Sequence, residues 1–465
     1  MSFIWVCFTT IYNYMHIILL SGGSGKRLWP LSNGARSKQF LKLLQTPDGE
    51  KESMVQRVLR QIGMALPSAS VTIATSESQR DFIENQLGTA VDVVTEPERR
   101  DTFPAIALSA SYLAMEKGVS PEEPVVVMPC DSYTGIEYFE TIAAMTSFVE
   151  RGVADLVLMG ITPTSPSTKF GYVVPEASSS CEAYRIVNRF TEKPDEENAK
   201  KLLEQGAFWN GGVFAFRLGY IMDIVNRYIS AGTFAELRGR YSEFPKISFD
   251  YEVAEKAGSV AVVPYNGSWK DLGTWNTLVE ELPLSVMGKV ILGSNAKDTT
   301  VINELNIPLV CDGVENVIVA ASHDGILICG KESAEQIKRY VDPLDSRPMF
   351  EERRWGVYRV LDDTYHTDGS HSLTKSITLN PGKSISYQRH NHRSEVWTFV
   401  EGEGVLVIDG EPRNVKVGET VAIPVGHLHT LKATTRLTFI EVQLGNPLIE
   451  EDIERFEWDW NSIDL

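Results

Sequence analysis

The fold of the first half of the chain is decided by the stretch HIILLSGGSGKR, residues 16–27, in which an apolar run leads directly into a glycine-rich loop. Residues 16–20 predict a buried strand, and the glycines predict a tight turn after it. Glycines also let the backbone approach a ligand closely, so main-chain N–H groups can surround a phosphate while Lys26, Arg27 and Lys38 supply positive charge. The alternative for this stretch alone is a strand–helix turn that binds nothing.

Two common nucleotide-binding motifs do not fit this loop. A P-loop, GxxxxGK[ST], would need glycine at Leu20 and serine or threonine at Arg27. A GxGxxG motif that starts at Gly23 would need glycine at Leu28. The sequence therefore disfavours a P-loop NTPase and a dehydrogenase that binds a dinucleotide.

Similar apolar runs recur along the first part of the chain and alternate with amphipathic stretches. This alternation predicts βαβ units and an α/β domain, residues 15–285, with a mostly parallel sheet covered on both faces. The expected strands are 16–20, 71–75, 91–96, 124–131 and 155–163, and the expected helices include 51–63, 104–117 and 194–205.

From residue 286 onward the pattern becomes all-β. Residues 286–345 hold short strands between turn residues, which predict a small β unit of stacked (β-helix-like) or meandering strands, followed by a linker. Residues 346–465 hold short strands with Gly, Pro and Asn turns, which predict a β-barrel or sandwich of the jelly-roll type.

Composition narrows the function classes. The 465 residues carry a formal net charge of −18, which argues against broad nucleic-acid binding because phosphates need a basic surface. Five scattered cysteines without a CxxC pair favour reduced thiols in a cytoplasmic protein. No Lys or Arg precedes Lys26, so the apolar start predicts neither a signal peptide nor a membrane anchor. We expect the fold to begin at Met15, with residues 1–14 as an extension.

Six of the eight histidines follow residue 360, which needs a local explanation. His390 and His392 are two residues apart in an expected strand, so both imidazoles would face one side and could reach one ion. Glu395 would join them at a bulge, and His429 would come from a later strand. Three imidazoles and one carboxylate suit a divalent metal such as Zn²⁺, Fe, Mn, Co or Ni. The alternative is a group of surface side chains on a barrel edge.

The glycine-rich loop is the first part of a longer ordered pattern. This pattern resembles the signature of the sugar-1-phosphate nucleotidyltransferases, and residues 28–32 and 38–41 resemble the mannose-1-phosphate guanylyltransferase branch. The resemblance implies that residues 15–285 form a Rossmann-like nucleotidyltransferase domain. The matching pieces are 22–32, 38–41, 96–97, 100–102, 104–108, 129–131, 160–164, 170–172, 190–194, 209–214, 248–251 and 269–275.

This resemblance implies roles for individual residues. In such enzymes a sugar phosphate attacks the α-phosphorus of a nucleoside triphosphate and pyrophosphate leaves, so positioning and charge neutralisation dominate. Arg27 and Lys38 would neutralise triphosphate oxygens, Asp131 and Asp271 would hold Mg²⁺, and Lys193 would bind the sugar phosphate. The other implied contacts are Gly171, Glu192 and Asn210 for the sugar, and Leu20, Gly22, Gly23, Ser24, Gly25, Lys26, Arg100 and Thr102 for the nucleotide.

Each of these residues also has a plain alternative. An isolated Asp, Lys or Arg is usually a solvated surface charge or the cap of a turn, and only the shared order of the motifs favours the functional interpretation. The chain also departs from the family pattern. The departures are Arg36-Ser37 where Tyr-Pro is frequent, Asp101 for Asn, Cys130 for Ala, Ser132 for His and Gly211 for Ser. Because Asp101 lies in the segment expected near the base, these departures leave the choice of base open.

The histidine region resembles the two cupin motifs and, more closely, the type II phosphomannose isomerase domain. The resemblance implies interconversion of mannose 6-phosphate and fructose 6-phosphate, with a metal polarising the substrate oxygens; the sequence does not identify the general base. The departures are Asn391 and Val396 for histidines, and Lys432-Ala433 for Glu-Asn. The matching pieces are 354–358, 380–382, Gln388, 390–393, Glu395, Trp397, 441–445 and 450–457.

Together these patterns predict an Mg²⁺-dependent enzyme that transfers GMP from GTP to mannose 1-phosphate, giving GDP-mannose and pyrophosphate. The cupin domain, residues 346–465, would add the isomerase. The alternative is a nucleotidyltransferase for another base or sugar whose cupin is a non-catalytic sugar-binding or oligomerising module. The expected partners are small molecules, without nucleic acid or membrane, and a homo-oligomer is compatible with the sequence.

Overall fold

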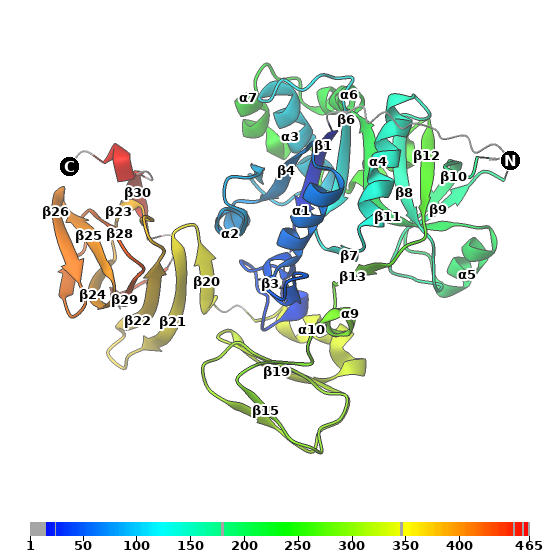
Figure 1. Cartoon of the computed structure of the whole chain (residues 1–465). Coiled ribbons are helices and arrows are strands. Elements are labelled where there is room, and N and C mark those ends of the chain that lie inside the picture. The colour runs from blue at the N-terminus through cyan, green and yellow to red at the C-terminus, as the bar shows by residue number, and fades with distance from the viewer. Residues whose placement is uncertain are drawn as a thin grey trace. The chain divides into compact units, whose positions relative to one another are not determined.

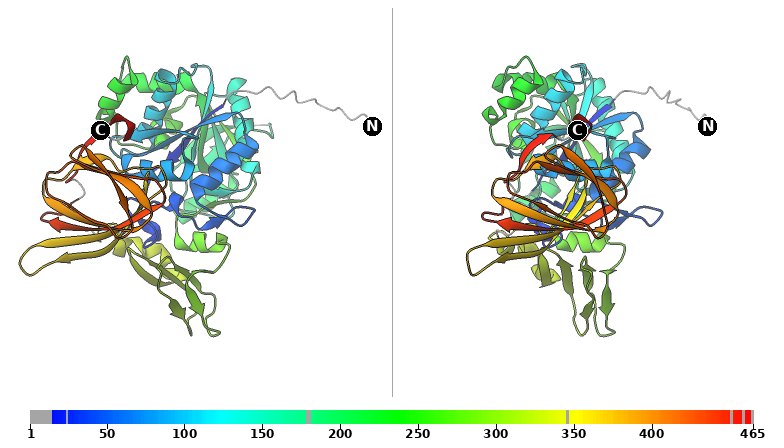
Figure 2. Two further views of the ribbon diagram at one scale, coloured as in Figure 1. Left: turned by 60° about the vertical axis from the view of Figure 1, so that its left-hand side comes forward. Right: turned by 90° about the vertical axis from the view of Figure 1, so that its left-hand side faces the viewer.

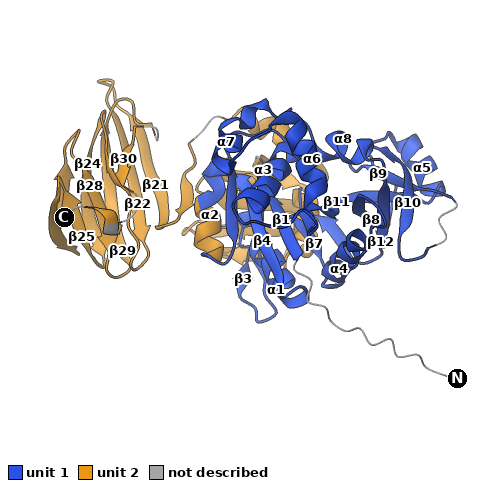
Figure 3. Cartoon of the chain, turned by 90° about the horizontal axis from the view of Figure 1, so that it is seen from above, with its two compact units in different colours: residues 1–23, 39–80, 89–273 blue, residues 24–38, 81–88, 274–465 orange. Residues whose placement is uncertain are grey.

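The computed structural model describes residues 15–23, 25–177, 181–344, 347–449, 452–457 and 460–463 (Figure 1). It divides into two compact units, which Figure 3 colours separately. Unit 1 comprises residues 1–23, 39–80 and 89–273, and unit 2 comprises residues 24–38, 81–88 and 274–465. The expected extension, residues 1–14, and the predicted nucleotide contact Ser24 lie outside the described residues.

Unit 1 is built on a nine-stranded sheet in the order β5-β4-β1-β6-β11-β8-β12-β10-β9. Neighbours among β5, β4, β1 and β6 pair in parallel, as do β8 and β12. β11 runs antiparallel to β6 and β8, and β10 runs antiparallel to β9 and β12. The strands are β1 (Met15–Ser21), β4 (Ala69–Ser76), β5 (Asp92–Glu96), β6 (Pro124–Pro129), β8 (Leu156–Ile161), β9 (Tyr172–Pro175), β10 (Arg185–Thr191), β11 (Phe208–Arg217) and β12 (Val260–Tyr265).

The five apolar runs that predicted strands form β1, β4, β5, β6 and β8, and all five run in one direction. The sequence did not predict β11, because Asn210-Gly211-Gly212 interrupts its apolar residues. In the structure this interruption is a bulge: the register of β11 against β8 shifts between Asn210 and Phe214, and Gly212 has φ +67°. The sheet is mixed, with antiparallel pairs around β11 at its centre and around β10 toward one edge.

Helices pack around this sheet (Figure 1), and α3, α6, α7 and α8 contribute residues to its core. α1 begins after Ser53, whose side chain and that of Gln56 bond each other's backbone N–H groups in a capping box. α3 is apolar all round and buried along most of its length. The helices are α1 (Met54–Ala65), α3 (Thr102–Met115), α4 (Glu137–Glu150), α5 (Glu196–Glu204), α6 (Leu218–Tyr228), α7 (Phe234–Gly239) and α8 (Phe249–Glu252). A further helix, α2 (Glu77–Leu87), belongs to unit 2 from residue 81 onward.

Short ladders complete unit 1. After β6, the chain forms β7 (Ser132–Thr134), which pairs antiparallel with β13 (Trp269–Asp271). β2 (Leu44–Gln45) pairs antiparallel with β3 (Lys51–Glu52). The β7–β13 ladder matters for function, since it joins two segments that lie far apart in the sequence.

The small β unit consists of stacked parallel strands, in the β-helix-like manner that the sequence left as one alternative. β14, β16 and β18 pair in parallel, β15 pairs in parallel with β17, and β19 closes the first sheet antiparallel to β18. The elements from α9 to α10 are α9 (Trp275–Glu281), β14 (Val286–Gly288), β15 (Val290–Leu292), β16 (Thr300–Asn303), β17 (Leu309–Cys311), β18 (Val317–Ser322), β19 (Gly325–Gly330) and α10 (Lys338–Val341).

Residues 25–38, which continue from the glycine-rich loop, pack within unit 2 against this β unit. Ser322 donates from Oγ to the carbonyl of Pro30 at 2.6 Å, and Asn33 donates to Asp324 at 2.6 Å. Arg36 bonds both carboxylate oxygens of Glu304 at 2.8 and 3.0 Å. The Arg36 departure from the family pattern therefore has a structural partner in this chain.

The C-terminal part of unit 2 is all-β, with antiparallel sheets in the orders β20-β21-β22-β29-β24-β27 and β26-β25-β28-β23-β30 (Figure 2). Alternate residues of β22, β24 and β29 are buried and form its interior with the facing sheet. The strands are β20 (Phe350–Arg353), β21 (Gly356–Tyr365), β22 (His371–Leu379), β23 (Tyr387–Arg389), β24 (Arg393–Glu401), β25 (Glu403–Ile408), β26 (Glu411–Lys416), β27 (Thr420–Ile423), β28 (His429–Ala433), β29 (Leu437–Gly445) and β30 (Glu454–Glu457).

None of the helices in the described residues combines the length and the apolar character that a membrane crossing requires.

Candidate active sites

In unit 1, two predicted metal ligands come together at the carboxyl end of β6. Asp131 is the second residue after this buried strand, and Asp271 is the last residue of β13. The β7–β13 ladder pairs Asp271 with Ser132, the neighbour of Asp131. Directly opposed residues of an antiparallel pair lie about 5 Å apart at Cα, so two aspartates 140 positions apart in sequence reach one small region. Their carboxylate oxygens are the ligand type that Mg²⁺ prefers.

The predicted sugar contacts form a second cluster in unit 1. Asn210 donates its backbone N–H to the carbonyl of Gly171 at 2.8 Å. A Cβ added at Gly171 would lie 2.4 Å from Oε2 of Glu192, so the Glu192 carboxylate lies directly against this glycine. Lys193 bonds Oε1 of Glu192 at 2.8 Å, and this contact and charge raise the pKa of Lys193. The structure thus brings Gly171, Glu192, Lys193 and Asn210 together.

Asp250 belongs to this cluster, although the sequence analysis assigns it no role. Asn210 donates from Nδ2 to Oδ1 of Asp250 at 2.6 Å. Burial raises the pKa of Asp250, and the charge of Glu192 raises it further. The available signal was the matching piece 248–251, which carried a family resemblance without a stated function.

The predicted nucleotide contacts of unit 1 lie at strand ends and at the start of α3. Leu20 is the last residue but one of β1, and its carbonyl accepts from the N–H of Cys130 at 3.2 Å. Gly22 and Gly23 are exposed after this strand. Arg100 donates to the carbonyl of Phe244 at 3.0 Å, and Oγ1 of Thr102 accepts from the N–H of Phe249 at 2.8 Å. Between them, Asp101 adopts φ +73° and accepts from the N–H of Thr102 at the start of α3.

The remaining predicted residues of the loop lie in unit 2. Gly25 has φ +63°, and a Cβ there would lie 2.3 Å from the carbonyl oxygen of Asn33, so the loop requires glycine. Lys26 donates to the carbonyl of Asp342 at 3.3 Å. Arg27 is exposed in the 3₁₀ turn Lys26–Leu28, and Lys38 is half-buried in a second turn, Lys38–Phe40.

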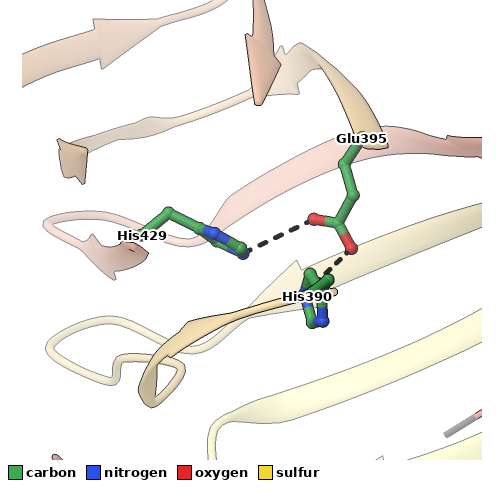
Figure 4. Close-up of side chains that lie close together, drawn as sticks. All are labelled: His390, Glu395 and His429. Carbon is green, nitrogen blue, oxygen red and sulfur yellow. Dashed lines mark ion pairs between the residues drawn. The ribbon is translucent and has the colours of Figure 1, made fainter. Parts of the chain in front are cut away.

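The interior of the C-terminal barrel holds the candidate metal centre, drawn in Figure 4. His390, Glu395 and His429 are buried, and their ligand atoms lie within 4.8 Å of one another. Nε2 of His390 lies 3.2 Å from Oε1 of Glu395, and Nε2 of His429 lies 3.6 Å from Oε2. The three side chains come from the end of β23, from β24 and from β28.

The hydrogen bonds of the two histidines set their tautomers. Nδ1 of His390 donates to the carbonyl of Asp452 at 2.6 Å, and Nδ1 of His429 donates to the carbonyl of His427 at 3.1 Å. Each Nε2 is then unprotonated, and its lone pair lies on the side of the Glu395 carboxylate. Among the described residues, buried Nε2 of His429 has no hydrogen-bond partner. Nη2 of Arg393 donates to Nε2 of His390 at 3.3 Å, whereas Nε2 of His429 is left as an open acceptor beside the carboxylate of Glu395, and such acceptors fit a divalent cation.

The charge states agree with this donor set. Burial lowers the pKa of His390 to about 4 and also lowers the pKa of His429, so both imidazoles are neutral at pH 7. Burial alone would raise the pKa of Glu395, but His429, His390 and Arg393 lower it below its usual value. Two neutral imidazoles and one carboxylate are the forms that bind a metal.

The structure does not bring His392 to this centre. Its side chain is 58% exposed and bonds Oδ1 of Asp452 at 2.9 Å. The expectation that His390 and His392 share one face assumed a continuous strand, but β23 ends at Arg389 and the chain bends before β24 begins at Arg393. In this structure His392 therefore lies apart from the other three expected ligands.

Two residues beside the centre were missed as contributors. Nε2 of Gln388 lies 3.4 Å from Nε2 of His390, and Nε of Arg393 donates to Oε1 of Glu395 at 3.0 Å. Gln388 could have been found by applying the same two-residue alternation backward from His390, within β23. Arg393 alternates with Glu395 on the inner face of β24.

The comparisons with known proteins agree with both regions. Residues 16–284 match the family model described as nucleotidyl transferase, and residues 348–458 match that described as mannose-6-phosphate isomerase C-terminal. The chain is 32% identical to a mannose-1-phosphate guanylyltransferase of Salmonella montevideo, over 94% of this chain and 98% of that protein. It is 31% identical to the xanthan biosynthesis protein XanB of Xanthomonas campestris pv. campestris (strain B100), over 95% and 97%.

The chain is also similar to a further curated relative and to a solved structure. The alginate biosynthesis protein AlgA of Pseudomonas putida is 31% identical over 95% of each chain. A crystal structure titled mannose-1-phosphate geranyltransferase, from Thermus thermophilus, superposes with a TM-score of 0.58 at 27% identity and covers 72% of this chain and 100% of that one. The α/β region followed by a cupin-like all-β region is therefore shared with known proteins along nearly the whole length.

Proposed function

Since the chain belongs to the mannose-1-phosphate guanylyltransferase family, in which a nucleotidyl transferase region precedes a mannose-6-phosphate isomerase region, we propose that it transfers GMP from GTP to mannose 1-phosphate. The products are GDP-mannose and pyrophosphate. The observation that carries this proposal is the β7–β13 ladder, which sets Asp271 opposite the neighbour of Asp131 at the carboxyl end of a parallel strand.

In this proposal Asp131 and Asp271 hold Mg²⁺, which neutralises phosphate charge when it is bound. The chain's own residues do the positioning. Glu192 and Asn210, beside Gly171, orient the sugar hydroxyls, and Lys193 binds the sugar phosphate so that its oxygen faces the α-phosphorus. Arg27 and Lys38 bind the triphosphate, and the loop amides at Gly22, Gly23 and Gly25 orient its oxygens.

Pyrophosphate release measured across GTP, dTTP, CTP and UTP, each with several sugar 1-phosphates, tests the assignment. The pair GTP and mannose 1-phosphate should give the highest kcat/KM. Asp271→Asn should lower this value by at least about a hundredfold, because it removes a charge from the Mg²⁺ ligands. Asp223→Asn, at an exposed position of α6, is the matched control and should leave it unchanged. Equal or better use of another base or sugar would establish the rival nucleotidyltransferase instead.

For the barrel, we propose a second activity, the interconversion of mannose 6-phosphate and fructose 6-phosphate. Its support is the buried group His390, Glu395 and His429 together with the match to the isomerase region. These three residues would hold a divalent metal such as Zn²⁺, which when bound polarises a carbonyl or hydroxyl oxygen. Arg393 holds Glu395 in place, and the buried side chains around it keep water from the reacting carbons.

The full chain, supplied in turn with different divalent metals, should form fructose 6-phosphate from mannose 6-phosphate. Glu395→Gln should abolish this activity. Metal that binds without any turnover would favour the alternative, a sugar-binding or oligomerising cupin. The described cysteines are free thiols, which supports a reducing, cytoplasmic setting for both activities.

A further inference from the structure

Asp250 is a half-buried carboxyl group beside the proposed sugar site, and the proposed mechanism leaves it without a role. Its Oδ1 accepts from Nδ2 of Asn210 at 2.6 Å, a short contact between an amide and a carboxylate. Burial is the main cause of its raised pKa, so the group is kept where its charge is disfavoured. Structural reasons alone would favour an uncharged residue of similar size at this position.

The fold holds Asp250 in this place firmly. Phe249, the preceding residue, is fully buried and packs on the β11 rings of Phe214 and Phe216, with centroids 4.8 and 5.8 Å apart. Ser248 caps the helix α8 through the N–H of Tyr251. Since β11 also carries Asn210, one strand fixes both partners of the Asn210–Asp250 bond.

The bulge in β11 fixes the oxygen of the Asn210 side-chain amide, whose nitrogen is bonded to Asp250. Oδ1 of Asn210 accepts from the N–H of Gly212 at 3.1 Å, while Nδ2 donates to Asp250. A primary amide has two N–H groups, so this arrangement leaves one for a ligand. Rotating the amide by half a turn would set Oδ1 against the Asp250 carboxylate and break both bonds. Asp250 therefore determines that position 210 presents a donor.

The carboxylate of Glu192, an acceptor beside Asn210, is the reason why the orientation of the Asn210 amide matters for sugar binding. Oε2 of Glu192 and Cβ of Asn210 both border Gly171, at 2.4 and 3.6 Å from the position that a Cβ there would take. A sugar hydroxyl has one hydrogen. If it donates to Glu192, it can only accept from Asn210, and this requires the N–H of Asn210 to face it.

We propose that Asp250 is a positioning residue that holds the Asn210 amide with its free N–H toward the sugar, so that Asn210 and Glu192 read a hydroxyl as a donor–acceptor pair. The inference rests on the proposed assignment of Asn210 and Glu192 to the sugar. Asp250 would then help to select the sugar without touching it, because it sets which atom of the Asn210 amide faces the sugar.

The test compares Asp250→Asn with the parent in the full chain. An asparagine has the same shape but can donate to Oδ1 of Asn210 and let the amide turn. We expect KM for mannose 1-phosphate to rise roughly ten- to hundredfold, as for a lost charge-assisted hydrogen bond, with KM for GTP unchanged. Asp223→Asn on α6 is the control and should match the parent.

A panel of monodeoxy mannose 1-phosphates separates positioning from general damage. In the parent, removal of one hydroxyl should cost most, and in both Asp250→Asn and Asn210→Ala that same removal should cost little. If KM for GTP and for every sugar worsens equally, Asp250 is structural and the inference is wrong. Asp250→Glu keeps the charge, and partial rescue of the sugar KM by it supports the inference if Asp250→Asn folds poorly.

The outcomes also distinguish this inference from the proposed function. A parent chain that releases no pyrophosphate with any nucleotide and sugar would overturn the proposed function. An active parent in which Asn210→Ala changes no sugar KM would overturn the sugar assignment. An active parent in which Asn210→Ala impairs sugar use but Asp250→Asn does not would overturn the inference alone.

Discussion

At the scale of single residues, Arg36 is the buried charge that ties the loop of residues 25–38 to the β-helix-like strands within unit 2. Burial acts to lower the pKa of Arg36, but Glu304 raises it above its usual value, so the ion pair persists at all ordinary pH. Arg36→Met would leave the partly exposed Glu304 without this partner, and we expect the free energy of unfolding to fall by about 2 kcal/mol. Urea denaturation measures this loss. Arg36→Met combined with Glu304→Gln should recover part of it, and equal losses in the single and double variants would contradict the explanation.

Glu441 gives a prediction about pH at the same scale. Burial raises its pKa to about 8, and the charge of Glu395 contributes. Between the ordinary value of 4.5 and about 8, the folded protein therefore holds more protons than the unfolded chain, so its stability falls as pH rises through this range. Glu441→Gln should remove this slope and exceed the parent in stability above pH 8, by at most about 5 kcal/mol.

Urea titrations of the metal-free chain at pH 6 and pH 9 test this prediction. Glu411→Gln, at an exposed position of β26, should keep the slope of the parent. A parent whose stability does not change between the two pH values would show that Glu441 titrates near its ordinary pKa.

Single residues also explain why the sequence predicted the group of His390, Glu395 and His429 but not the separate position of His392. Residue types and spacing were enough for His390, Glu395 and His429, because each carries ligand chemistry in a motif. The fate of His392 depended on where β23 ends, and that end is set by its pairing with β28 and β30. Such pairing joins residues about 40 to 70 positions apart, so no local pattern contains it.

At the scale of elements, the bulge in β11 sets the direction of Asn210. Gly212 adopts φ +67°, which a residue with a Cβ reaches only with strain, and no other atom lies within 4 Å of where that Cβ would be. Gly212→Ala should therefore cost about 1 kcal/mol and disturb the N–H that holds the Asn210 amide. We expect KM for mannose 1-phosphate to rise severalfold while KM for GTP stays constant.

Gly206→Ala is the matched control for this prediction. Gly206 also has positive φ, +70°, with open space around it, but it lies in the turn after α5 and away from the bulge. It should lower stability by a similar amount and leave both KM values unchanged. A rise in the sugar KM in both variants would attribute the effect to lost stability.

The elements also show which parts of the fold a sequence pattern can predict. Continuous apolar runs predicted β1, β4, β5, β6 and β8, because a strand buried on both faces needs no polar alternation. β11 escaped prediction because its bulge places polar and glycine residues inside a central strand. One of the residues that break the pattern, Asn210, belongs to the proposed sugar site, so the same bulge that orients it also hid the strand.

At the scale of the whole molecule, the two proposed activities draw on separate sets of residues, 20–271 for guanylyl transfer and 390–429 for the isomerase. His429→Ala removes a fully buried ligand and should abolish metal retention and isomerase turnover. Guanylyl transfer should stay within about twofold of the parent, because none of its proposed residues lies in the barrel. Metal content after dialysis and both activities of the full chain are the measurements.

His392→Ala is the matched control, since it removes a histidine of the same sequence motif whose side chain is exposed and bonded to Asp452. It should retain the metal and both activities. Loss of metal in His392→Ala as in His429→Ala would restore the four-residue ligand set that the sequence predicted. Loss of guanylyl transfer in His429→Ala, with the chain still folded, would instead show that the state of the barrel governs the other activity, and the two functions would then have to be treated as one coupled system.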